Sequence, residues 1–162
     1  MIKKALVLVS ALAMLVSGTL FTASAQDAPT PAQRAASATE TRQAVFKLLY
    51  FNLIPIAGMA QGAPFDAELA QKNALNIAAL APMIPDLFSA MDTRDFDVET
   101  EALDVIWEDS AGFSEKAQAL LEGANAFAEV AAGGDMAATL GAFRGLGGSC
   151  GNCHDDFRVD ND

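Results

Sequence analysis

The amino-acid sequence predicts an all-α protein, an antiparallel up-down-up-down bundle of four helices. Apolar residues recur at every third or fourth position in four separate segments, which is the spacing of one helix face. Glycines and prolines separate most of these segments, and no run of alternating apolar residues is long enough for a strand. Helices joined by short loops pack as antiparallel neighbours, so a bundle is the expected architecture.

The first two helices are expected in the first half of the chain. Helix one covers residues 32–59, and Pro55 should kink it near its end. A turn rich in glycine follows, and Asp66 is a suitable N-cap for helix two. Pro82 and Pro85 should end or distort helix two. The expected inner faces are Arg42, Phe46, Leu49, Leu53 and Ile56 in helix one, and Leu69, Ala70, Asn73, Ile77, Leu80 and Ile84 in helix two.

The second half contains the other two helices after a charged connection. Residues 89–100 have no periodicity, and a short extra turn of helix is expected before Trp107. Helix three covers residues 110–132 and ends at Gly133-Gly134, after which Asp135 caps helix four. The expected inner face of helix three consists of Phe113, Ala117, Leu120, Ala124, Phe127 and Ala131. In helix four, one face recurs with a seven-residue period, at Met136, Leu140, Phe143, Gly147, Cys150, His154 and Phe157.

Residues 1–25 are predicted to be a secretory signal peptide. Lys3 and Lys4 precede an apolar stretch, residues 5–16, and Ala23-Ser24-Ala25 is a typical cleavage site. The apolar stretch is too short to span a bilayer comfortably. The mature protein is therefore expected to be exported without a membrane span and to form one domain, residues 26–162.

The mature chain is strongly acidic. The whole sequence has 10 basic and 21 acidic side chains, and removal of Lys3 and Lys4 leaves 8 against 21, a formal charge of −13. This balance argues against nucleic acids and anionic membranes as partners. It is compatible with solubility alone, or with a redox partner that has a basic patch.

The most informative motif is Cys150-Gly151-Asn152-Cys153-His154, which contains both cysteines and the only histidine. C-x-x-C-H is the attachment sequence of c-type haem: two thiols bind the haem covalently and the histidine ligates the iron. On a helix, these three side chains project toward one side. The motif predicts one haem c per chain, bound through Cys150 and Cys153, with His154 as metal ligand.

The motif has three other interpretations. A structural zinc site needs about four protein ligands, and two cysteines with one histidine are too few. A thioredoxin-like redox pair opens a helix after a strand, whereas this motif lies late in a helical segment. A chance match is the third. Glycines at positions 145, 147, 148 and 151 fit close approach of a flat ring, a helix that is locally frayed or bent, or both together.

The sequence resembles cytochrome c′, the class II c-type cytochromes, from Thr41 to Arg158. The motif lies about ten residues from the C-terminus, whereas most C-x-x-C-H cytochromes have it near the N-terminus. The other shared parts are the Arg42-Gln43 pair, the Gly62-Ala63-Pro64-Phe65-Asp66 turn, Glu101-Ala102 followed by Ile106-Trp107, and Asp155-Asp156-Phe157-Arg158.

The resemblance implies a five-coordinate, high-spin haem whose one protein axial ligand is His154. It places Phe46 over the vacant side of the iron, where many family members have leucine. A related low-spin branch uses a methionine of helix one instead. Met59 is the only mature methionine in or near that helix, and it lies at the far end, past Pro55. The high-spin form is therefore favoured.

The resemblance also assigns further haem contacts. Arg42 and Gln43 match residues that contact the haem or its propionates, and Glu101 matches another contact more loosely. Arg158 is expected beside the imidazole. From the sequence alone, Arg42 could equally be a surface residue, Phe46 an ordinary core residue and Arg158 a charge that favours the helix C-terminus.

Two functions follow from these features. The first is a periplasmic electron carrier that uses the haem iron, and the second is a protein that binds nitric oxide or carbon monoxide for scavenging, storage or sensing. No second titratable residue can be placed beside the iron, so an enzyme is not expected. A homodimer through helix one is expected, because family members form one and this helix is apolar beyond one stripe, at Val45, Leu48, Tyr50 and Phe51.

Overall fold

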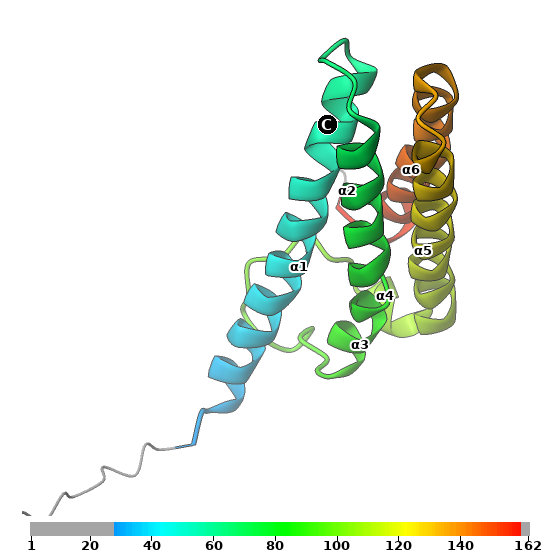
Figure 1. Cartoon of the computed structure of the whole chain (residues 1–162). Coiled ribbons are helices and arrows are strands. Elements are labelled where there is room, and N and C mark those ends of the chain that lie inside the picture. The colour runs from blue at the N-terminus through cyan, green and yellow to red at the C-terminus, as the bar shows by residue number, and fades with distance from the viewer. Residues whose placement is uncertain (1–27, 160–162) are drawn as a thin grey trace, which may run out of the picture.

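The computed structural model describes residues 28–159, in which every regular element is a helix (Figure 1). The predicted signal peptide and the mature N-terminus at Gln26 lie outside the described residues. The helices are α1 (Pro31–Ala60), α2 (Ala67–Leu80), α3 (Met83–Ser89), α4 (Val105–Glu108), α5 (Ser110–Ala132) and α6 (Met136–Phe157).

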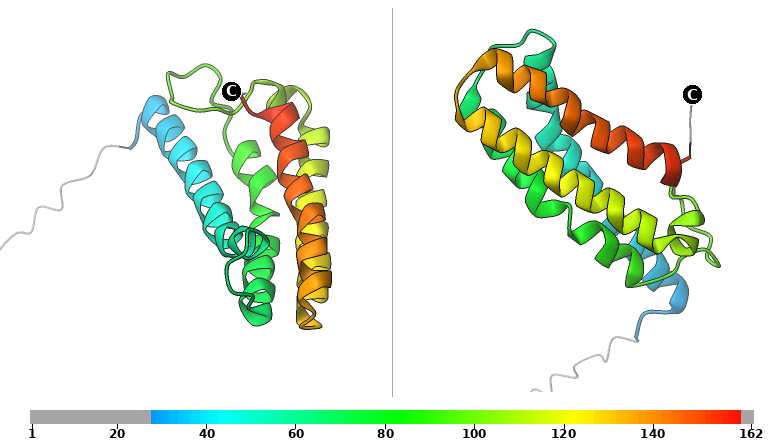
Figure 2. Two further views of the ribbon diagram at one scale, coloured as in Figure 1. Left: turned by 90° about the horizontal axis from the view of Figure 1, so that it is seen from above. Right: turned by 90° about the vertical axis from the view of Figure 1, so that its right-hand side faces the viewer.

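These elements form the predicted four-helix bundle. Helix α2 packs against both α1 and α5, and α5 packs against α6. The predicted second helix is divided at Pro82 into α2 and α3, as its two prolines suggested. Figure 2 shows that α1 and α6 diverge from each other toward the end where the chain leaves α6, with α2, α3 and α5 behind them. The space between α1 and α6 is where the site lies.

Local sequence signals fix the helix ends. Asp66, Asp109 and Asp135 each accept a hydrogen bond from a backbone N–H in the first turn of α2, α5 and α6, at 2.9, 3.0 and 2.6 Å. Gly62 and Gly134 make the turns between the long helices and have φ of 101° and 72°. A side chain is strained in this left-handed region, which is why glycine occupies both turns.

Helix α1 continues through Pro55 to Ala60. Proline removes one backbone donor, and one turn before it two asparagines connect α1 to α2. The Asn52 Nδ2 donates to the Leu48 carbonyl at 2.8 Å, and its Oδ1 accepts from Asn76 Nδ2 of α2 at 2.8 Å. This polar contact between the two helices fixes α1 against α2 just before the proline.

Among the described helices, α1 alone has the length and apolar composition of a membrane span. The same features are found in bundle helices, and α1 packs against α2 and α3. Its buried residues include the charged Arg42 and the polar Thr39 and Asn52. The helix therefore serves here as one side of the bundle.

The core follows the predicted periodicity, except that four residues expected inside are exposed: Phe46 and His154, which line the cavity described below, and Leu69 and Met136. Every predicted inner residue of helix three is buried: Phe113, Ala117, Leu120, Ala124, Phe127 and Ala131. Leu69 and Met136 were expected inside but are 37% and 54% exposed. Both lie in the first turn of their helices, at the end of the bundle that carries the tight turns (Figure 1), where fewer neighbouring residues cover them.

The connection between α3 and α4 is attached to the end of α6. Ala102 and Arg158 form an antiparallel bridge, in which the Leu103 N–H donates to the Phe157 carbonyl at 3.1 Å. The Val159 N–H donates to the Glu101 carbonyl at 2.8 Å. This attachment brings residues 54 to 58 positions apart in the sequence together beside the motif on α6.

Candidate functional site

The haem-attachment motif lies in the last two turns of α6. Cys150 and Cys153 are free and half-buried, and the Cys150 thiol lies 3.7 Å from the Leu146 carbonyl. The helix is unbroken through the motif, so the frayed alternative for its glycines is wrong. A Cβ added at any of the glycines 145, 147, 148 and 151 would meet nothing within 4 Å. The surface of α6 around the thiols is therefore open enough for a flat ring to approach.

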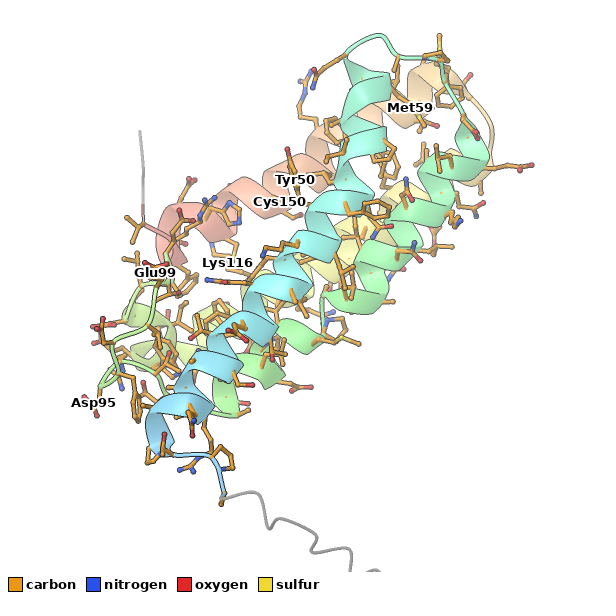
Figure 3. All side chains as sticks on the ribbon, turned by 90° about the vertical axis from the view of Figure 1, so that its left-hand side faces the viewer. Tyr50, Met59, Asp95, Glu99, Lys116 and Cys150 are labelled. Carbon is orange, nitrogen blue, oxygen red and sulfur yellow. The ribbon has the colours of Figure 1, made fainter. Side chains whose placement is uncertain are left out.

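A cavity of about 980 Å³ extends from the motif across to α1. Cys150, Cys153 and His154 line one wall, Phe46, Leu49 and Leu53 of α1 line the opposite wall, and α2, α3 and α5 contribute Ile77, Phe88 and Leu120 to the base. Its lining is mainly apolar, as in typical cofactor sites, and its volume lies at the upper end of their range. Figure 3 shows Tyr50, Lys116 and Cys150 around the opening, with Glu99 at one end.

All eight residues predicted for the site line this cavity. They are Cys150, Cys153 and His154 on α6, Arg42, Gln43 and Phe46 on α1, Glu101 on the connection, and Arg158 just beyond α6. They come from three segments far apart in the sequence. Because they line one cavity, all eight are available to a single ligand.

Phe46 begins a series of aromatic rings across the end of the cavity. Its ring is 37% exposed and meets Phe88 edge-on, with centroids 6.5 Å apart. Phe88 meets Phe113 at 4.9 Å, and Phe113 meets Phe157 of α6 at 5.2 Å. Such edge-to-face pairs are favourable arrangements of aromatic rings. At Phe46, the wall that faces the motif therefore presents an aromatic ring, which has no hydrogen-bond donor.

Arg42 is the buried charge of this wall. Its guanidinium donates to the Leu87 carbonyl at 3.1 Å, to the Thr93 hydroxyl at 2.9 Å and to the Met91 carbonyl. Its Cζ lies 4.5 Å from the centroid of the Phe88 ring and 5.5 Å from that of Trp107. The surface alternative for Arg42 is wrong, because the side chain fastens α1 to the connection. Burial lowers the pKa of this guanidinium.

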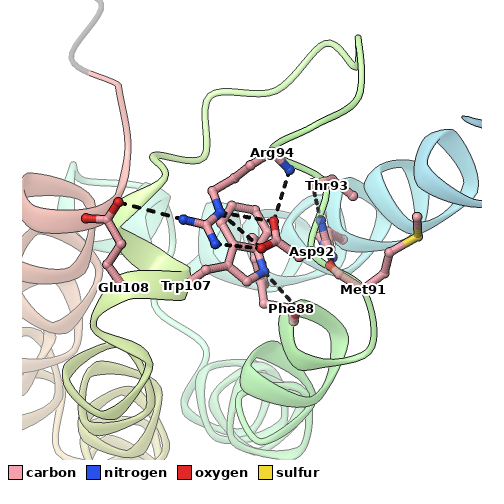
Figure 4. Close-up of polar contacts among 8 residues, drawn as sticks. Phe88, Met91, Asp92, Thr93, Arg94, Trp107 and Glu108 are labelled. Carbon is pink, nitrogen blue, oxygen red and sulfur yellow. Dashed lines mark hydrogen bonds and ion pairs between the residues drawn. The ribbon is translucent and has the colours of Figure 1, made fainter.

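The connection is held next to Arg42 by an exposed charge cluster (Figure 4). Arg94 pairs with Asp92 at 2.7 Å and with Glu108 at 3.7 Å. The hydrogen bond from Arg94 lowers the pKa of the Asp92 carboxyl. Below the cluster, the indole N–H of Trp107 donates to the Phe88 carbonyl at 3.2 Å. The segment without periodicity is thus ordered by side chains rather than by regular backbone structure.

Glu101 and Arg158 form an ion pair beside His154. The Arg158 guanidinium donates to one carboxylate oxygen of Glu101 through Nε at 2.8 Å and through a terminal nitrogen at 2.6 Å. Arg158 caps the end of α6 in extended conformation. On the opposite side of the opening, Gln43 donates to the Glu99 carbonyl at 2.9 Å. Two contacts, one from α1 and one from α6, therefore hold the connection at the cavity rim.

The electrostatics keep the motif uncharged at neutral pH. Partial burial, and next the nearby Arg158, lower the pKa of the His154 imidazole, so its lone pair is free to ligate a metal. Burial raises the pKa of both the Cys150 and Cys153 thiols. The site therefore presents a neutral imidazole and two protonated thiols to the cavity.

Comparison with known proteins identifies the family. The sequence profile of cytochrome c′ matches residues 37–158. Cytochrome c-554 of Cereibacter sphaeroides is 38% identical over 152 residues, which cover 93% of this chain and 96% of that protein. The chain belongs to the cytochrome c′ family. A cytochrome c′ of the same species is 37% identical over 124 residues, 74% of this chain and 81% of the relative.

Solved structures of the family have the same fold. Cytochrome c′ from Shewanella frigidimarina superimposes with a TM-score of 0.69 at 37% identity, over 78% of this chain and 97% of the other. A nitric oxide complex of a mutant cytochrome c′ from Alcaligenes xylosoxidans superimposes with a TM-score of 0.67 at 26% identity, over the same shares. Membership in this family implies covalently bound haem c, and the two thiols, the imidazole and the cavity fit that group.

The sequence alone did not reveal several polar residues of the site, among them three charged residues and a tyrosine. Lys47, Tyr50, Glu99 and Lys116 also line the cavity. Lys116 of α5 pairs with Asp156 at 2.7 Å and donates to the Asn152 carbonyl at 3.0 Å, so it braces the motif from a neighbouring helix. The only signal in the sequence was adjacency, since Lys47 follows Phe46 and Lys116 precedes Ala117 of the predicted inner face.

Proposed function

We propose that this chain is a periplasmic cytochrome that carries one five-coordinate, high-spin haem c and transfers electrons through the haem iron. The observation that carries this proposal is the cavity, in which Cys150, Cys153 and His154 on α6 face Phe46 on α1. No methionine is among the residues that line it in the described part of the chain. Phe46 therefore leaves one side of the iron without a protein ligand.

Each residue has a defined task in this proposal. Cys150 and Cys153 would anchor the haem by thioether bonds, and His154 would ligate the iron. When bound, haem supplies an iron that cycles between the ferrous and ferric states. The apolar side chains of the wall would exclude water. Partial burial, and next the charge of Arg158, lower the pKa of the His154 imidazole and favour its neutral form, while Glu101 acts in the opposite direction.

A second candidate function is the binding of nitric oxide or carbon monoxide. Phe46, the residue expected over the vacant side of the iron, has no hydrogen-bond donor, which disfavours bound dioxygen there but not these two gases. A related cytochrome c′ from Alcaligenes xylosoxidans has been solved as a nitric oxide complex. Scavenging, storage or sensing would all use this vacant side, and none of them makes the protein an enzyme.

Absorption spectra of the purified mature protein test both functions. The proposal expects high-spin spectra in the ferric and ferrous states, reversible one-electron reduction, and a spectral change when nitric oxide is added. Low-spin spectra in both states would mean that a protein side chain fills the sixth position and would contradict the vacant site. Fast electron exchange with a basic redox partner favours the carrier, whereas slow exchange with tight nitric oxide binding favours the gas-binding role.

A further inference from the structure

Positive charge is concentrated at the cavity of this acidic protein. Without Lys3 and Lys4, the chain has eight lysines and arginines. Four of these eight line the cavity: Arg42, Lys47, Lys116 and Arg158. Only Glu99 and Glu101 among the lining residues are acidic. The lining therefore carries an excess of two positive charges in a chain whose mature charge is strongly negative, which indicates an anionic group in the ligand.

Three of these four cations already have partners. The three nitrogens of the Arg42 guanidinium donate to Leu87, Met91 and Thr93. Lys116 is held by Asp156 and the Asn152 carbonyl, and Arg158 is held by Glu101. Using any of them to bind an anion would weaken contacts that hold the connection or α6 in place.

Lys47 differs from the other three. Within residues 28–159 it makes no hydrogen bond or ion pair, and it lines the cavity one position beyond Phe46. Tyr50 lies three residues further along α1 and therefore on the same helix face. Its side chain is 65% exposed, lines the same cavity, and has no hydrogen-bond partner among residues 28–159. One ammonium and one phenol are thus free to donate at the rim.

The haem that we propose for this cavity has two carboxylates, the propionates, on an otherwise apolar ring. An ionised carboxylate beside an apolar cavity needs a cation or hydrogen-bond donors, because burying it unpaired is costly. We infer that Lys47, with Tyr50 beside it, binds a haem propionate, in the role that the family resemblance gave to Arg42. Arg42 instead holds the connection in place. This inference rests on the proposed function.

Holoprotein variants test the inference. Lys47→Met removes the free cation, Lys47→Arg keeps the charge, and Tyr50→Phe removes only the hydroxyl. Lys72→Met, on α2 and absent from the cavity lining, is the matched control for loss of one lysine. Mass spectrometry first establishes that each variant carries covalent haem, and then the reduction potential is measured against pH. Resonance Raman spectra report hydrogen bonding of the propionates.

Lys47→Met should lower the reduction potential relative to Lys72→Met, because a nearby positive charge favours the more reduced haem. It should also raise the propionate pKa by about one unit or more, since an opposite charge within a few ångströms normally depresses a carboxyl pKa by that amount. The pH range in which the potential falls should therefore move upward, and Lys47→Arg should restore it. Tyr50→Phe should alter the propionate Raman bands with a smaller effect on the potential.

The remaining charged groups of the cavity are common to all variants. They are Arg42 on α1, Glu99 and Glu101 on the connection, Lys116 on α5, and Cys150, Cys153, His154 and Arg158 on or beside α6. If Lys47→Met matches Lys72→Met in potential, pH dependence and Raman spectrum, the assignment of Lys47 is overturned while the haem assignment stands. A mature protein without covalent haem would overturn both the assignment and the proposed function.

Discussion

In the proposed function, Phe46 is the side chain that controls access to the vacant side of the haem. It contacts Phe88 and belongs to the aromatic series that ends at Phe157. Any ligand on this side must displace the ring from its packed position. Moving a side chain to a poorer rotamer costs on the order of 1 kcal/mol, and repacking its neighbours adds to this.

Phe46→Ala should therefore raise the affinity for carbon monoxide at least tenfold, since about 1.4 kcal/mol corresponds to a factor of ten. The ferric absorption spectrum should also change if water enters as a sixth ligand. Carbon monoxide titration of the ferrous protein measures the effect. Phe51→Ala is the control, because Phe51 is on the same helix but is 69% exposed and does not line the cavity. An unaltered affinity and ferric spectrum would mean that Phe46 does not guard the iron.

The rate at which the two thiols are alkylated should depend on pH, and the direction of this dependence follows from their burial. Burial raises the pKa of Cys150 and Cys153 in the folded, haem-free chain. The thiolate is the reactive form, so folded protein should be alkylated more slowly than unfolded protein at neutral pH. The rate should rise only as the pH passes the ordinary thiol pKa of about 8.5.

This pH dependence can be measured with iodoacetamide on protein produced without residues 1–25, which is then not exported. Samples in buffer and in urea are compared, and Cys150→Ala and Cys153→Ala variants separate the two thiols. Equal rates in buffer and urea across the pH range would contradict the protection of these thiols in the fold.

At the scale of elements, Arg42 connects α1 to the irregular segment between α3 and α4. Removing it leaves the Thr93 hydroxyl and two backbone carbonyls without their donor, in a region where Thr93 is only 3% exposed. Each unsatisfied buried group costs about 1–3 kcal/mol. The stacking on Phe88 is lost as well.

Arg42→Met should therefore lower the free energy of unfolding by about 3 kcal/mol, which is large for a single substitution. Chemical denaturation followed by circular dichroism measures it. Arg144→Met, at an exposed position of α6, should change stability by no more than about 0.5 kcal/mol. Similar stability of the two variants would show that the contacts of Arg42 do not hold the connection.

The sequence predicted the elements well where the signals were local. The aspartates at helix starts, the glycines in turns and the break at Pro82 each act within a few residues, so their effects could be inferred directly. The bridge between Ala102 and Arg158 could not, because its partners are 56 positions apart and the backbone there has no repeating pattern. The burial of Arg42 also depends on carbonyls supplied by this distant segment.

For the site, the sequence predicted residues that line the cavity but not how these residues are paired. The motif and the family resemblance gave eight residues that all line one cavity. Neither source could say which cations are already paired, since pairing depends on where Asp156, Glu101 and Thr93 lie in space. Lys47 is an example. A lysine that follows a residue of the inner face, here Phe46, normally indicates only the solvated side of the helix.

At the scale of the whole molecule, the outer face of α1 remains apolar and uncovered. Leu48, Phe51 and Ile54 are 50%, 69% and 49% exposed, and Leu75 of α2 is 48% exposed. Exposed apolar patches mark interaction surfaces, and a second copy of the chain is the expected partner. A related cytochrome c′ is described as having ligand-controlled dimer dissociation.

We expect the wild-type protein to sediment as a dimer at micromolar concentration. Phe51→Asp should shift it toward the monomer, because a charge in an apolar interface is costly to desolvate. Met136→Asp, at an exposed apolar position at the start of α6, should leave the dimer intact. A monomer mass for the wild type, or equal behaviour of the two variants, would exclude a dimer through this face.

The central claim is that the cavity between α1 and α6 holds haem c bound covalently to Cys150 and Cys153. Mass spectrometry of the exported protein after extraction with acidified acetone tests this claim most directly. The account predicts a mass equal to the mature polypeptide plus one haem, with neither cysteine available to a thiol reagent. The bare polypeptide mass, together with two cysteines that are readily alkylated, would contradict it.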